Sequence, residues 1–138
     1  MNKVQLWNES EYNYAAACGF IPNIRLYFHE DEEIRPCMLI VPGGGYTVVS
    51  PSEGEIVAKK FYEMGYQTAV VTYTTNLLQM IPLKMQAMQD LMRAIRYIRK
   101  HAEELHVEKD KIMLCGFSAG AHACGSVAVH WQEFENTE

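Results

Sequence analysis

Apolar residues along the chain fall into short unbroken runs and longer stretches with helical spacing. The unbroken runs are CMLIV at 37–41, TAVVTY at 68–73 and KIMLCGF at 111–117. Short continuous apolar runs that are bounded by turn residues predict strands buried on both faces of a sheet. Residues 23–29, NIRLYFH, alternate in part between apolar and polar positions and predict a further strand.

A first helix is expected after SPSE at 50–53. Ser50 and Glu53 have the spacing of a capping box, and Pro51 suits the first helical position. Gly65 is expected to end this helix at its C-terminal side. The apolar positions with helical spacing are Ile56, Val57, Phe61 and Met64.

Two more helices are predicted further along the chain. The second begins at Pro82 and carries one apolar stripe at steps of three and four residues. The third runs from Ala119 to Trp131, and its small residues would let its backbone come close to a sheet. The stripe of the second helix consists of Met88, Leu91, Met92, Ile95, Ile98, Ala102 and Leu105.

Strands and helices therefore alternate through a single domain, residues 1–138. This order predicts an α/β fold with a doubly wound, mostly parallel sheet, helices on both faces and right-handed crossovers. Ligands of such sheets bind beyond the carboxyl ends of the strands. Two glycine-rich segments, PGGGY at 42–46 and GFSAG at 116–120, are expected at those ends.

Composition and charge argue against several classes of binding partner and location. The chain is 49% hydrophobic and carries a net charge of −5, which argues against a nucleic-acid backbone as partner. The N-terminus lacks the pattern of a secretory signal, and no apolar run approaches the length of a membrane span. The four cysteines form no CxxC pair, so we expect free thiols in a reducing cytoplasm and no metal site.

Ser118 lies between two glycines where an apolar run meets a run of small residues. A strand that turns sharply into a helix strains its turn residue, and neighbours two positions away must be small. Gly116 and Gly120 meet this requirement, which is the G-x-S-x-G pattern of a nucleophile elbow. The alternative is a glycine-rich turn whose serine has no chemical role.

The PGGGY segment offers backbone amides without side chains in the way. Gly44 and Gly45, together with the amide of Ala119, are candidates for an oxyanion hole in acyl transfer. Two alternatives are a loop that only turns the chain and a loop that cradles a phosphate. The phosphate loop is disfavoured because no Lys-Ser/Thr pair follows and the spacing is not GxGxxG.

With these motifs in view, the chain resembles the α/β-hydrolase superfamily, and within it the bacterial esterase/lipase group that includes acetyl-xylan-esterase-like carbohydrate esterases. The matching motifs are VPGGGY at 41–46, GYQTAVVTY at 65–73 and GFSAGAH at 116–122. Ala121 stands where relatives often have a second glycine. The resemblance implies Ser118 as nucleophile, an oxyanion hole from the glycine loop and Ala119, a small-molecule ester substrate, and no cofactor.

In that superfamily an Asp or Glu and then a His follow the nucleophile in the sequence. We interpret His122 as a packing or hydrogen-bonding residue, and His130 lies twelve residues beyond Ser118. The chain is therefore expected to be the N-terminal portion of a hydrolase domain, a partial α/β-hydrolase fold that is inactive alone. Its 111–117 strand would then be an apolar edge that favours self-association.

Two alternatives to an ester hydrolase stay open at this point. One is a non-catalytic, flavodoxin-like module that uses the glycine loops to hold a nucleotide or phosphate. The other is a peptidase of the α/β-hydrolase type, which shares the elbow around Ser118.

Overall fold

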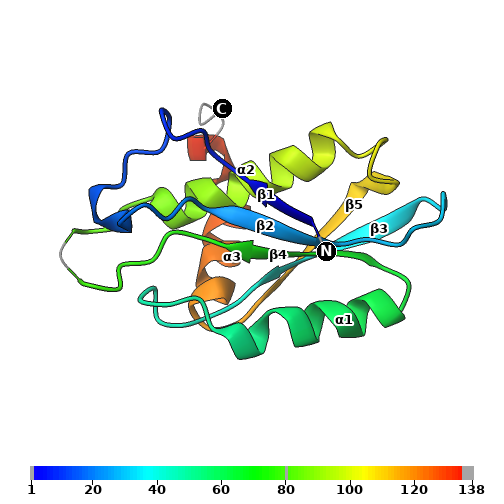
Figure 1. Ribbon diagram of the computed structural model, residues 1–138, viewed down its shortest axis with the longest axis horizontal. Helices are drawn as coiled ribbons and strands as arrows, with labels where there is room; N and C mark the ends of the chain where they lie inside the picture. Colours follow the sequence, from blue (N-terminus) through cyan, green and yellow to red (C-terminus); the bar gives the residue numbers. More distant parts are fainter. Residues whose placement is uncertain (1, 80, 135–138) are drawn as a thin grey trace.

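The computed structural model describes residues 2–79 and 81–134, which build one mixed sheet covered by helices (Figure 1). The sheet has five strands in the order β1-β2-β4-β3-β5. Strand β3 is parallel to both β4 and β5, whereas β2 is antiparallel to β1 and β4. The strands are β1 (Asn2–Gln5), β2 (Asn23–Tyr27), β3 (Arg35–Val41), β4 (Gln67–Thr72) and β5 (Val107–Gly116).

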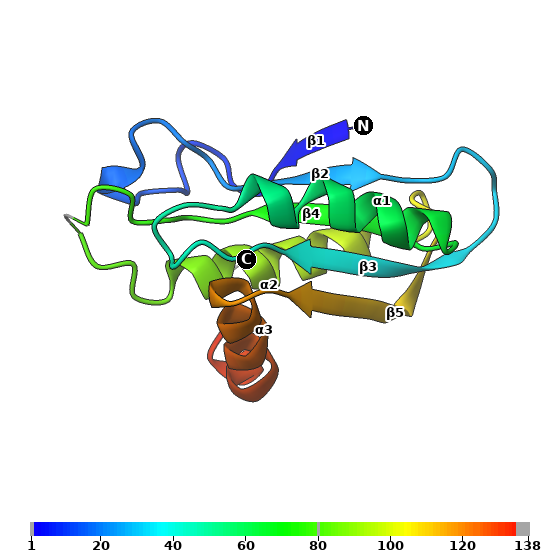
Figure 2. The same cartoon turned by 90° about the horizontal axis from the view of Figure 1, so that it is seen from below.

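Helices lie on both faces of this sheet. Helix α1 (Glu55–Glu63) covers one face, and α2 (Gln86–Lys100) and α3 (Ala119–His130) cover the other (Figure 2). Short 3-10 turns are η1 (Ala15–Ala17), η2 (Pro51–Glu53) and η3 (Trp131–Phe134). The predicted doubly wound α/β fold is confirmed. No helix in the described ranges is long and apolar enough to cross a membrane.

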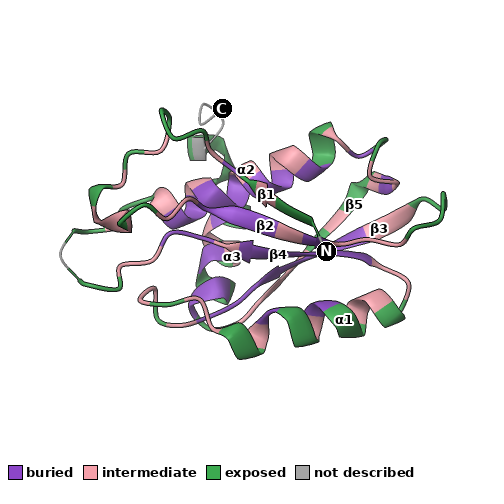
Figure 3. Ribbon diagram, viewed as in Figure 1, coloured by how far each residue is buried: buried purple, intermediate pink, exposed green. Residues whose placement is uncertain are grey.

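Strand β3 shows how the sheet separates two apolar layers. Cys37, Leu39 and Val41 point into the larger core with α2 and α3, whereas Met38 and Ile40 face α1. This alternation follows from the two-residue period of a strand. All five residues are buried, as the purple central strands in Figure 3 show. The interpretation of 37–41 as a strand buried on both faces is correct.

Helices α2 and α1 differ in how well the sequence predicted them. All predicted stripe positions of α2 up to Ile98 are buried, but the helix begins at Gln86 rather than Pro82. Lys84 has a φ of 51°, which is incompatible with a right-handed helix at that position. On α1, Ile56 and Met64 are 71% and 62% exposed, so including them in its apolar face was wrong.

The predicted capping box at the start of α1 is also wrong. The Ser50 hydroxyl contacts the Ser52 hydroxyl, and residues 51–53 form a separate 3-10 turn ahead of Gly54. Glu53 instead accepts a hydrogen bond from the amide of Gly43 at 3.3 Å. A distant backbone donor has therefore replaced the local one that the capping pattern requires.

Gly65 does end α1, as predicted. It has a φ of 97°, and its amide donates to the carbonyl of Tyr62 at 3.0 Å. The amide of Tyr66 donates to Phe61 at 3.1 Å, which completes a Schellman motif. The rings of Phe61 and Tyr66 meet edge to face, and this supplies the apolar contact that commonly accompanies the motif.

Strand β5 is the outermost strand beside β3, so no strand of the described residues lies beyond its other edge. Its residues are half-buried or exposed apart from Val107, and Met113 is 37% exposed. The expected burial of 111–117 on both faces is therefore wrong, because its side chains are covered only in part, whereas its expected position as an edge strand is confirmed. Strand β1 at the opposite edge was not predicted, since its residues are mostly polar and exposed.

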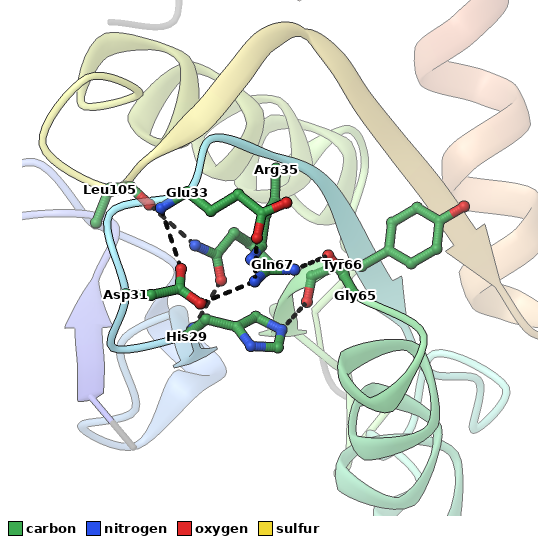
Figure 4. A network of polar contacts seen from close by, with 8 residues as sticks. All are labelled: His29, Asp31, Glu33, Arg35, Gly65, Tyr66, Gln67 and Leu105. Atoms are coloured by element: carbon green, nitrogen blue, oxygen red, sulfur yellow. Dashed lines mark hydrogen bonds and ion pairs between the residues drawn. The ribbon is translucent and has the colours of Figure 1, made fainter.

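A polar network joins the elements at the amino ends of the parallel strands (Figure 4). The fully buried Gln67 accepts from the amide of His29 at 2.8 Å and donates to the carbonyl of Leu105 at 3.4 Å. Arg35 donates to the carbonyl of Gly65 at 3.1 Å and forms ion pairs with two acidic side chains. These contacts tie the loop after β2 to the start of β4.

Candidate active site

Ser118 occupies the tight turn between β5 and α3. Its φ of 52° and ψ of −116° lie outside both the helical and the strand regions. A non-glycine residue held in such a conformation costs about 1–3 kcal/mol, which the surrounding structure must offset. The side chain is exposed and makes no capping hydrogen bond to α3 within the described part of the chain.

The glycines on either side of Ser118 leave no room for a side chain. A Cβ atom on Gly116 would lie 2.7 Å from the Cα of Ala121. A Cβ atom on Gly120 would lie 2.0 Å from the carbonyl oxygen of Val41, at the end of β3. The first glycine allows the turn itself, and the second allows α3 to start directly against β3.

The glycine loop that follows β3 lies directly against this turn. A Cβ atom on Gly43 would be 3.1 Å from the Cβ of Ser118 and 2.6 Å from the carbonyl oxygen of Phe117. The structure therefore brings both glycine-rich segments together at the carboxyl ends of β3 and β5. Gly44 and Gly45 have φ values of 133° and 64°, where glycine is strongly favoured.

Several backbone amides at this rim are available to a ligand. Within the described residues, the amides of Gly44 and Gly45 donate no hydrogen bond. Ala119 is the first residue of α3, and the amides of a helical first turn have no partner inside the helix. The partial positive charge of the helix end adds to their attraction for an anion.

Tyr46 connects the glycine loop to α3. Its hydroxyl lies 2.7 Å from Nδ1 of His122, and their rings meet edge to face. The carbonyl of Tyr46 accepts from the amide of Asn76 at 2.7 Å. Partial burial raises the pKa of the Tyr46 hydroxyl, with a smaller contribution from Cys124. His122 is thus a hydrogen-bonding residue, as its place one turn after Ser118 suggested.

The remaining candidates for proton transfer or metal binding lie elsewhere. His130 is at the far end of α3, where its Nδ1 is 2.9 Å from a carboxylate oxygen of Glu133. No group of three or more His, Cys, Asp or Glu side chains within the described ranges could hold a metal ion.

Sequence reasoning missed two residues that support the glycine loop. Glu53 was assigned to a helix cap but contacts Gly43, and Tyr73 donates its hydroxyl to the carbonyl of Pro42 at 2.5 Å. Burial raises the pKa of Tyr73 above its ordinary value, and the neighbouring Tyr46 and Glu53 add to the shift. Neither role has a local sequence signal, because both contacts join segments that are separated by at least ten residues.

The strand order, the helices on both faces and the serine between β5 and α3 define a partial α/β-hydrolase fold. Within that class, the chain belongs to the BD-FAE family, whose model matches residues 24–138.

Known relatives are hydrolases and esterases. The chain is 45% identical over 131 residues to endo-1,4-beta-xylanase B of Butyrivibrio fibrisolvens, covering 95% of this chain and 21% of that protein. The structure matches the acetyl ester-xyloside bifunctional hydrolase from Caldicellulosiruptor lactoaceticus with a TM-score of 0.85 and 27% identity, covering 94% and 47% of the two chains. It matches carboxylesterase Cest-2923 from Lactobacillus plantarum WCFS1 with a TM-score of 0.72 and 27% identity, covering 91% and 50%. The chain thus spans about half the length of these solved structures and a fifth of the xylanase.

Proposed function

We propose that this chain carries the nucleophile and the oxyanion hole of a serine carboxylic ester hydrolase. The observation that supports this most is the contact between the glycine loop and Ser118, which puts an exposed hydroxyl beside amides that have no partner among the described residues. Membership of the BD-FAE family and the likeness to esterases agree with that chemistry.

In the proposed reaction, Oγ of Ser118 attacks the ester carbonyl carbon while its proton passes to a general base. The carbonyl oxygen becomes negative and accepts hydrogen bonds from the amides of Gly44, Gly45 and Ala119. The intermediate collapses, the C–O bond to the alcohol breaks, and the alcohol leaves with a proton. Water then hydrolyses the acyl-serine and restores the hydroxyl, so no cofactor takes part.

The general base is not supplied by the histidines that follow Ser118. His122 lies in α3 one turn behind the elbow that turns Ser118 outward, with its Nδ1 near the Tyr46 hydroxyl, and His130 lies at the other end of α3. We therefore expect the isolated chain to turn over esters slowly or not at all. Residual rate would come from the oxyanion hole and binding alone.

For the substrate, we propose a small ester and favour an acetylated sugar. The support is the name of the similar structure, an acetyl ester-xyloside bifunctional hydrolase. The match to the xylanase covers 21% of that protein and gives no argument for cleavage of xylan by this chain. A cytoplasmic location stays a prediction from the sequence.

Replacement of the serine tests the proposed nucleophile. Ser118→Ala in the natural protein that carries this chain should lower the hydrolysis of p-nitrophenyl acetate by about 10³-fold or more. Ser126→Ala, the same change further along α3, serves as the control and should leave the rate close to that of the parent. Parental activity in Ser118→Ala would show that the nucleophile is another residue.

The same protein preparation separates the two alternative functions. A rise in melting temperature with a nucleotide, without Ser118-dependent hydrolysis, would favour a flavodoxin-like binding module. Ser118-dependent cleavage of peptides in preference to esters would favour a peptidase.

A further inference from the structure

We propose that Glu53 is a positioning residue that orients the oxyanion loop through the amide of Gly43. The inference rests on the proposed function, because it concerns how the amides of Gly44 and Gly45 are held. It starts from the hydrogen bond between the Gly43 amide and Oε2 of Glu53, at 3.3 Å.

The peptide unit between Pro42 and Gly43 is held from both ends. Its N–H donates to the carboxylate of Glu53, and its carbonyl accepts from the hydroxyl of Tyr73 at 2.5 Å. A peptide unit is planar, so two opposed hydrogen bonds fix the direction of the whole plane. The start of the glycine loop therefore has one orientation relative to β4 and the η2 turn.

The next peptide unit carries the first proposed oxyanion donor. The carbonyl of Gly43 accepts from the amide of Ser50 at 2.8 Å, which directs it toward the segment that leads into η2. In a trans peptide the N–H points opposite to the carbonyl, and the described chain contains no cis bond. The amide of Gly44 is therefore turned away from Ser50, and it has no partner in residues 2–79 and 81–134.

Both polar backbone groups of Gly43 are thus bound by residues 50–53, one by a main-chain amide and one by the Glu53 side chain. The short η2 turn keeps Ser50 and Glu53 close together, and the Glu53 amide donates to the carbonyl of Ser50 at 3.3 Å. Of these two contacts with Gly43, only the one from Glu53 is made by a side chain. A substitution of Glu53 therefore removes this contact and leaves the residues of the glycine loop unchanged.

The carboxylate also lies close to the reacting serine. Oε2 of Glu53 and Cβ of Ser118 are 3.3 and 3.1 Å from the point where a Cβ of residue 43 would stand. A negative charge so near an oxyanion opposes its formation. Glu53 therefore holds the loop by accepting a hydrogen bond and not through its negative charge. A neutral acceptor of the same shape should also hold the loop.

The contact can be tested by NMR without any turnover. Glu53→Ala should shift the Gly43 amide proton upfield and speed its exchange with solvent, whereas Glu53→Gln keeps an acceptor oxygen and should preserve slow exchange. Glu55→Ala removes a nearby carboxylate that forms an ion pair with exposed Lys59, so it serves as the control. An unchanged Gly43 signal in Glu53→Ala overturns the proposal, whatever the kinetics.

The kinetic arm uses the natural protein that carries this chain. Glu53→Ala should lower kcat for p-nitrophenyl acetate by about 10- to 100-fold with little change in KM, because misplaced amides affect the transition state most. Glu53→Gln should recover most of that loss. A Gln variant as slow as the Ala variant, with equal melting temperatures, contradicts positioning by a hydrogen bond. A failed Ser118→Ala test would instead reject the nucleophile and leave the Gly43 signal unaffected.

Discussion

The two ends of the parallel strands use polar groups in opposite ways. At the amino ends, the Gln67 side chain bonds to a backbone amide and a backbone carbonyl, and Arg35 bonds to the carbonyl of Gly65 and to two carboxylates (Figure 4). At the carboxyl ends, Gly44 and Gly45 present amides that have no partner among the described residues. Paired groups stabilise the fold, whereas donors left free at a strained turn are suited to a ligand.

The largest expected effect comes from filling the close contact at the carboxyl ends. Gly120→Ala puts a Cβ 2.0 Å from the carbonyl of Val41 and should lower the free energy of unfolding by about 3 kcal/mol. Gly125 lies on the same helix with nothing within 4 Å of an added Cβ. Gly125→Ala should therefore raise stability by about 0.5–1 kcal/mol.

Urea denaturation of the two variants beside the parent measures both changes. The same change, glycine to alanine, would then alter the free energy of unfolding in opposite directions at two positions of α3. That result would separate the effect of the close approach to β3 from the effect of helix propensity. Equal stability of the two variants would contradict the packing of α3 against Val41.

A change at the amino ends should affect stability but not chemistry. Gln67→Ala leaves the amide of His29 and the carbonyl of Leu105 unpaired, which should cost about 1–3 kcal/mol. Gln89→Ala on α2 is the control, since it removes a half-buried amide outside this network. Thermal unfolding measures the loss, and the kcat of the folded Gln67→Ala protein should match the parent. If kcat fell as far as expected for Glu53→Ala, residues at the amino ends of the strands would also affect catalysis. That result would contradict the difference described between the amino and carboxyl ends.

The smallest effect is expected at the outer edge of β5, the last strand of the sheet on that side. We propose that two copies associate through this edge at high concentration, because β5 ends the sheet formed by the part of the chain that the structure describes. Met113→Lys should weaken that association by placing a charge on the edge. Met64→Lys adds the same charge at the exposed residue that caps the C-terminal end of α1, and it should not weaken the association. Sedimentation velocity over a concentration series measures the difference, and a monomeric parent would contradict the proposal.

Much of the fold was predictable because its signals are local. Three elements are predicted by patterns of neighbouring residues. These patterns are the continuous apolar run of β3, the apolar stripe of α2 and the glycine that ends α1. The two glycine motifs were also expected at the carboxyl ends of strands, and both lie there. The start of α2 was misplaced because a single residue, Lys84, adopts a positive φ that no pattern indicates.

The unpredicted parts depend on contacts between distant segments. Glu53 fits a capping pattern locally, and only the folded chain brings Gly43 within its reach. The edge position of β5 was expected, but how far its faces are covered depends on the neighbouring elements, which an apolar run does not specify. The bond between Tyr46 and His122 likewise joins positions that are 76 residues apart.

Covalent labelling of Ser118 tests the central claim most directly. The natural protein that carries this chain is treated with a fluorophosphonate, digested and analysed by mass spectrometry. A single adduct on Ser118, which is lost in Ser118→Ala, is the predicted result. An unlabelled Ser118 in a preparation that hydrolyses esters, or an adduct on another residue, would contradict it.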